Sequence, residues 1–77
     1  MSERMGIGDF ARRAGMAISA VRFYGDRGLL PPAWVDPATG YRYYRRDQVR
    51  AATAIALLRS LDVPLATIRE LLAAGDQ

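Results

Sequence analysis

Apolar positions repeat with the period of a helix through the first third of the chain. From Ile7 the apolar side chains recur every three or four residues, and Gly15 follows as a residue type that often ends helices. A second helical pattern covers residues 18–27 and ends at Gly28. Its inner face is expected to carry Ile18, Val21 and either Tyr24 or Gly25. Two short helices joined by a turn with a glycine are typical of a helix-turn-helix, here over about residues 7–28.

The pattern then changes from helix to strand. The double proline at residues 31–32 cannot continue a helix, and β-forming residues at 34–35 and 41–44 flank a turn-forming run at 36–40. These signals predict a β-hairpin over about residues 33–45, with its tip near Pro37–Gly40. Alternation along the second strand puts Tyr41 and Tyr43 on one face and Arg42 and Tyr44 on the other, so that one face can pack while the other meets phosphate.

The last third of the chain is predicted to be a pair of helices over about residues 46–74. The first runs from about Arg46 to Leu61 and is apolar on nearly every side over 51–58, so it needs cover on more than one face. After a break at residues 62–64, the second places Leu65, Ile68 and Leu72 on one stripe and ends at Gly75. We therefore expect a mainly α fold with four helices and a small β-hairpin, a winged helix-turn-helix that forms one domain over residues 1–77.

The positive charge of the chain comes entirely from arginine. The net charge is +3, and residues 1–50 carry +4 while residues 51–77 carry −1. A guanidinium group presents a planar fork of donors that fits phosphate and the edge of guanine, which favours a nucleic-acid partner for the first two-thirds of the chain. A coding bias toward arginine explains the absence of lysine equally well, without changing what the charge does.

The composition excludes several kinds of chemistry. There is no cysteine and no histidine, which removes thiol nucleophiles, disulfides, the usual zinc ligands and imidazole catalysis. No base near neutral pKa remains to activate a nucleophile, so an enzyme is not expected. Ala51–Leu58, one of the longest stretches without charge, falls far short of the roughly 20 apolar residues of a membrane span. We expect a cytoplasmic protein with no metal, no cofactor and no membrane partner.

Two segments are candidates for contact with DNA. A helix fits the major groove, and a hairpin beside it can reach an adjacent groove or the backbone. Taken alone, residues 22–24 are equally consistent with an arginine on a solvated face beside two core aromatic rings. Residues 41–46 hold three tyrosines and three arginines, which can all donate hydrogen bonds to phosphate oxygens; the alternative is an edge hairpin that its arginines keep soluble.

Five segments, in this order and spacing, resemble the N-terminal DNA-binding domain of the MerR family of transcription regulators. The segments are Ile7-Gly8-Asp9-Phe10-Ala11 with Gly15, Val21-Arg22-Phe23-Tyr24, Gly28-Leu29-Leu30-Pro31, Gly40-Tyr41-Arg42-Tyr43-Tyr44, and residues 65–72. Residues 35–44 are most similar to the multidrug-responsive, BmrR-like members. The chain departs from the family pattern at Ala17, where many relatives have a serine or threonine cap, and at Gly25, where many have a glutamate.

The resemblance implies a homodimer on a pseudo-palindromic promoter element of double-stranded DNA. Members of the family hold this DNA bent and twist it, so that misaligned promoter boxes face RNA polymerase, which they affect indirectly. The DNA contacts that the resemblance implies are Arg12, Arg13, Ser19, Arg22, Phe23, Tyr24, Tyr41, Arg42, Tyr43 and Arg45. In this assignment Arg22 and Tyr24 belong to the recognition helix, Tyr41 and Arg42 contact the backbone from the wing, and Arg42→Ala weakens binding to all sequences alike.

Family members normally continue into a dimerisation helix and an effector domain. We therefore expect this chain to be a fragment that dimerises through a C-terminal helix outside it. Two other functions are compatible with the residues: a protein-interaction module that binds an acidic partner, such as a polymerase subunit, and a stand-alone architectural or excision-type DNA-binding factor.

Overall fold

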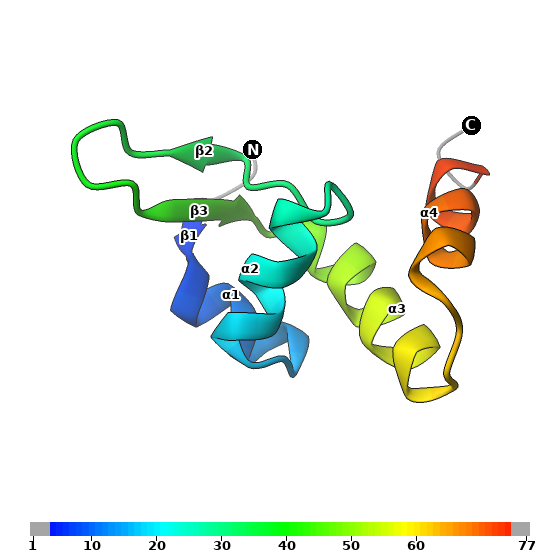
Figure 1. Cartoon of the computed structure of the whole chain (residues 1–77). Helices are drawn as coiled ribbons and strands as arrows, with labels where there is room; N and C mark the ends of the chain where they lie inside the picture. Colours follow the sequence, from blue (N-terminus) through cyan, green and yellow to red (C-terminus); the bar gives the residue numbers. More distant parts are fainter. Residues whose placement is uncertain (1–3, 75–77) are drawn as a thin grey trace.

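The computed structural model describes residues 4–74, which form four helices and a three-stranded antiparallel sheet (Figure 1). In chain order the elements are β1 (Arg4–Gly6), α1 (Ile7–Ala14), α2 (Ile18–Asp26), β2 (Trp34–Val35), β3 (Arg42–Arg45), α3 (Gln48–Ser60) and α4 (Leu65–Ala74). The expected fold class, mainly α with a small β-hairpin, is confirmed. Gly75, the expected end of the last helix, lies outside the described residues.

Helices α1 and α2 meet at the turn that the sequence predicts. Gly15 has a φ of 70°, and its N–H donates to the carbonyl of Arg12 at 3.2 Å. The N–H of Met16 donates to the carbonyl of Ala11 at 2.9 Å, so the last carbonyls of α1 are satisfied within the turn. The left-handed backbone favours glycine here, and α2 begins only three residues later, at Ile18.

The start of α2 carries no side-chain cap, which allows a stability prediction. Ala17 holds the N-cap position with φ −70° and ψ 150°, a conformation from which a serine hydroxyl could accept a hydrogen bond from the first turn. We expect Ala17→Ser to raise the free energy of unfolding by about 1 kcal/mol in urea titrations. The matched control is Ala38→Ser at the exposed hairpin tip, which should leave stability unchanged. Equal effects at both positions would contradict the prediction.

The sheet joins the N-terminus of the chain to the hairpin. Its strand order is β1-β3-β2, with Met5 opposite Tyr44, and with Tyr43 between Gly6 and Trp34. At the tip, the N–H of Gly40 donates to the carbonyl of Asp36 at 2.7 Å, which confirms the predicted hairpin, although Tyr41 precedes β3 instead of lying in it. We call this hairpin, residues 34–45, the wing.

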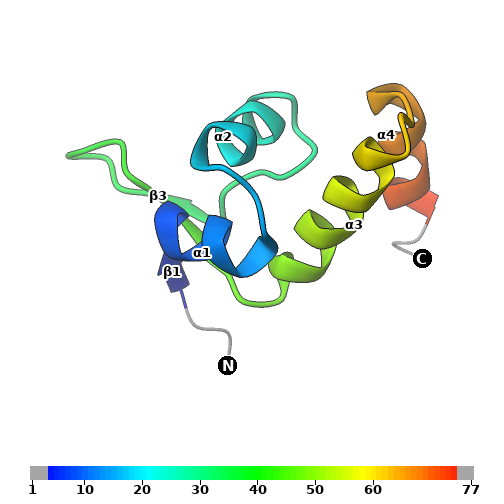
Figure 2. The same cartoon turned by 90° about the horizontal axis from the view of Figure 1, so that it is seen from below.

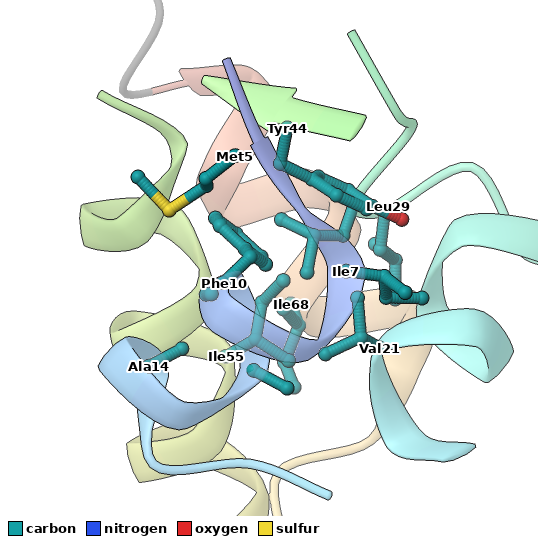
Figure 3. Packing of buried hydrophobic residues seen from close by; sticks show 12 residues of the cluster. Met5, Ile7, Phe10, Ala14, Val21, Leu29, Tyr44, Ile55 and Ile68 are labelled. Carbon is teal, nitrogen blue, oxygen red and sulfur yellow. The ribbon is translucent and has the colours of Figure 1, made fainter. Parts of the chain in front are cut away.

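The core lies between the inner face of the sheet and the helices (Figure 3). The rings of Phe10 and Tyr44 stack at 4.4 Å between centroids, and both side chains are fully buried. Val21, Ile55 and Ile68 bring α2, α3 and α4 into the same cluster. One small core therefore fixes the position of every helix relative to the wing.

One expected core position is wrong. Ile18 is 46% exposed, whereas Val21 on the same helix is fully buried. The physical reason is its place in the first turn of α2, where its side chain lies beside Gly8 of α1 at the edge of the core. The predicted stripe of Leu65, Ile68 and Leu72 on α4 is confirmed, since Ile68 is buried and both leucines pack against the core.

Helix α4 is also tied to the end of α2. A guanidinium nitrogen of Arg69 donates to the carbonyl of Arg27, the residue that caps α2. Seen from two directions, α4 lies at the end of the molecule away from the wing (Figures 1 and 2). No helix within residues 4–74 is long and apolar enough to cross a bilayer.

Candidate nucleic-acid interface

The outward face of α2 combines arginine and aromatic side chains. Ser19, Arg22 and Phe23 are exposed, and Tyr24 is half-buried. The guanidinium carbon of Arg27 lies 4.6 Å above the centre of the Phe23 ring. Phe23 is therefore not a core residue, so residues 22–24 are not an arginine beside two core aromatic rings. Within residues 4–74 Arg22 forms no ion pair, so its donors point at solvent.

The wing lies directly against the C-terminal end of α2. The Arg42 Nη2 donates to Asp26 Oδ1 at 2.8 Å, which joins β3 to the last residue of α2. A Cβ built on Gly25 would stand 3.0 Å from Arg42 Nη1 and 3.3 Å from Tyr44 Oη. The glycine at residue 25 therefore leaves room for the Arg42 guanidinium beside α2. It holds the exposed face of α2 and the wing side by side (Figure 1).

Two polar atoms beside this contact, on Arg42 and Tyr44, are shielded from water. Hydrogen bonding to Asp26 raises the pKa of the Arg42 guanidinium, and burial raises the pKa of the Tyr44 phenol. Arg42 Nη1 and Tyr44 Oη are both buried without a hydrogen-bond partner among residues 4–74. Arg42 was expected to contact phosphate from the surface of the wing, whereas it lies on the inner face of the sheet with Tyr44.

The outer face of the sheet carries a second aromatic group. Tyr43 packs against Trp34 at 5.3 Å and Tyr41 at 5.1 Å between ring centroids. The guanidinium carbon of Arg4 lies 4.5 Å from the centre of the Trp34 ring. The sequence interpretation missed Arg4, because its place beside the wing follows from a strand pairing that spans some 40 residues of chain.

The remaining expected contacts lie in surface ion pairs. Arg12 and Arg13 of α1 both pair with Asp9, the latter at 3.7 Å, and Arg45 Nε pairs with Asp47 at 3.0 Å. Exposed pairs of this kind contribute little to stability and can exchange their partner for a phosphate. Residues 4–74 contain no pocket and no group of three side chains that could hold a metal ion.

Comparisons with known proteins agree on one family. The family described as MerR HTH family regulatory protein matches residues 5–75. The multidrug-efflux transporter 1 regulator of Bacillus subtilis is 36% identical over 64 residues, which are 83% of this chain and 23% of that protein. The transcriptional regulator BrlR of Pseudomonas aeruginosa is 40% identical over 65 residues, which are 84% of this chain and 24% of that protein.

A solved structure has the same fold. In the cryo-EM structure of an EcmrR–DNA complex in EcmrR-RPo, the matching chain superposes with a TM-score of 0.83 at 33% identity, over 95% of this chain and 27% of that one. The chain thus spans about a quarter of the length of each of these three relatives. The match over residues 5–75 and the shared fold show that this chain belongs to the MerR family of helix-turn-helix regulatory proteins.

Proposed function

We propose that this chain binds double-stranded DNA at a promoter in a sequence-specific manner and regulates transcription by distorting that DNA. The observation that carries the proposal is the contact between Arg42 and Asp26, which holds the exposed arginine face of α2 beside the wing. A helix and an adjacent hairpin in this arrangement can occupy a major groove and the flanking backbone together. That EcmrR is seen in complex with DNA supports the proposal.

The proposed DNA contacts fall into two chemical groups, contacts to base edges and contacts to phosphates. Arg22 would read base edges from the recognition helix α2, with Ser19, Phe23 and Tyr24 as its neighbours, because guanidinium matches the acceptors of guanine. Side chains on α1 and the wing would bind phosphates and fix the register of the protein on the duplex. These phosphate contacts are Arg12, Arg13, Tyr41, Tyr43 and Arg45.

We propose further that the full-length protein acts as a homodimer and affects RNA polymerase indirectly. Three leucines are each at least half exposed: Leu57 in α3, Leu61 directly after α3, and Leu71 in α4. A second copy, joined through a helix that follows α4 in the full-length protein, would cover this surface and place two domains on one bent operator. We propose no catalytic role, cofactor or membrane partner for this chain, and we propose that it acts in the cytoplasm.

A salt titration tests the proposal. We expect the chain to bind a fluorescein-labelled duplex that it selects from a random-sequence library, with an affinity that falls steeply as salt rises. The slope of log K against log salt should be about −3 if Arg12, Arg13 and Arg45 each neutralise one phosphate, at about −0.9 per phosphate.

A scrambled duplex is the control for specificity, and it should bind more weakly at every salt concentration. Failure to bind any duplex would refute the proposal and favour a module that binds an acidic protein. Equal affinity for both duplexes would favour an architectural factor without sequence preference.

A further inference from the structure

We propose that Arg42 is a positioning residue: it fixes the wing against the recognition helix and is not itself a phosphate ligand. This inference rests on the proposed DNA-binding function and deepens it, because it assigns the orientation of the wing to one contact between β3 and α2. Asp26 is the anchor of this contact, and Gly25 provides the space for it.

The exposure of Arg42 separates it from the other arginines of the proposed interface. Its side chain is 25% exposed, against 78% for Arg12, 47% for Arg13 and 48% for Arg45. Of its two terminal nitrogens, Nη2 is bonded to Asp26 and Nη1 is buried. An arginine binds phosphate well when its fork of donors is free to face two oxygens. The donors of Arg42 instead face α2, since Nη2 is bonded to Asp26 and Nη1 is buried.

Three segments converge on the guanidinium of Arg42. A Cβ built on Gly25 would be 3.0 Å from Arg42 Nη1 and 3.3 Å from both Tyr44 Oη and the carbonyl oxygen of Leu30. The backbone of α2, the connection to β2 and the inner face of β3 are therefore in near contact here. A side chain at residue 25 would push the Arg42 guanidinium aside by a few tenths of an ångström. The glycine that departs from the family pattern is thus the residue type that leaves the most room for this arginine.

The contact connects to the core through Tyr44. The Tyr44 ring is fully buried and stacks on Phe10, so the strand beside Arg42 cannot shift without disturbing α1. Asp26 is 16 residues from Arg42 in sequence and belongs to another element. A charge-assisted hydrogen bond that joins two elements next to a rigid core restricts their relative angle, which a contact within one element does not.

Asp26→Asn is a test in which the two possible roles of Arg42, phosphate ligand and positioning residue, predict opposite changes in DNA affinity. The carboxylate of Asp26 is 64% exposed at the end of the helix that would face DNA. If Arg42 were a phosphate ligand, removing this carboxylate would free it and strengthen DNA binding. If Arg42 positions the wing, Asp26→Asn should weaken binding to the selected duplex by roughly 5-fold to 10-fold, because the carboxylate acceptor of a charge-assisted hydrogen bond is replaced by a neutral amide oxygen, which holds Arg42 less firmly.

Asp9→Asn is the matched control. It makes the same chemical change at the carboxylate that pairs with Arg12 and Arg13, which are proposed phosphate contacts. We expect Asp9→Asn to strengthen binding while Asp26→Asn weakens it.

A second measurement does not depend on DNA binding. Because the chain contains no cysteine, spin labels can be placed at Ala38→Cys on the wing tip and at Ala17→Cys before α2. We expect one narrow distance distribution in the otherwise unchanged chain and a broader or shifted one with Asp26→Asn or Arg42→Ala, at an unchanged helical circular dichroism signal.

An unchanged distance distribution or tighter binding by Asp26→Asn would each overturn the inference. Failure of the unsubstituted chain to bind any duplex would instead refute the proposed function. The distance measurement would still decide whether Arg42 orients the wing.

Discussion

Replacing Arg22 with alanine should abolish the preference of the chain for its selected duplex over a scrambled one. Arg22 is exposed on the outward face of α2 and forms no ion pair within residues 4–74, so its donors are available to base edges. A bidentate contact to guanine contributes about 1–3 kcal/mol of discrimination, which corresponds to roughly a 5-fold to 150-fold loss of affinity. Gel-shift titrations with both duplexes measure this difference directly.

The control for Arg22→Ala is Arg59→Ala. Arg59 is an exposed arginine at the C-terminal end of α3, where it donates to the carbonyl of Val63 at 2.8 Å. The two substitutions change the net charge equally, but only Arg22 lies on the proposed recognition helix. We expect Arg59→Ala to keep its preference for the selected duplex. If Arg22→Ala keeps that preference too, α2 does not read the bases.

Phe10→Ala should destabilise the chain severely, because it removes a large side chain from the centre of the core. Phe10 is fully buried and stacks on Tyr44 beneath the wing. Truncating a buried phenylalanine costs about 3–5 kcal/mol, and a domain of this size has a total stability of about 4–12 kcal/mol. The variant should therefore lose about a quarter or more of its free energy of unfolding, and its urea midpoint should fall accordingly.

Phe23→Ala is the matched control, because it removes the same side chain from the exposed face of α2. Phe23 is 42% exposed and contacts Tyr24 and Arg27 at the surface, so we expect a loss below about 1 kcal/mol. Phe23→Ala should weaken DNA binding while the chain remains folded, since Phe23 is proposed to face the duplex. Similar urea midpoints for the two variants would contradict the core assignment of Phe10.

The elements that could be predicted from the sequence are those with local signals. The left-handed glycine at residue 15 and the turn-forming run at 36–40 act on neighbouring residues, so α1, α2 and the wing follow from short stretches of chain. The sequence predicts the third helix over about residues 46–61, and α3 runs from Gln48 to Ser60, so the predicted and observed bounds agree closely. The family resemblance covered the same elements in the same order.

The features that the sequence did not predict depend on contacts between distant residues. Strand β1 has only three residues, too few to show an alternating pattern, and it forms because β3 pairs with it. The inward direction of Arg42 follows from the packing of Asp26 and Gly25 against it, which no periodicity along one strand can indicate. Ile18 has the right spacing for a core residue but stands at the edge of the core, where the first turn of α2 begins.

The hydrogen bond from Arg69 to the carbonyl of Arg27 gives α4 a direct mechanical link to the helix proposed to read DNA. Ile68, the adjacent residue, is fully buried in the core, so α4 is held at two neighbouring positions, one of which it shares with the end of α2. Arg27 directly follows Asp26, the residue that is bonded to Arg42, so a displacement of α4 would act on the junction between α2 and the wing.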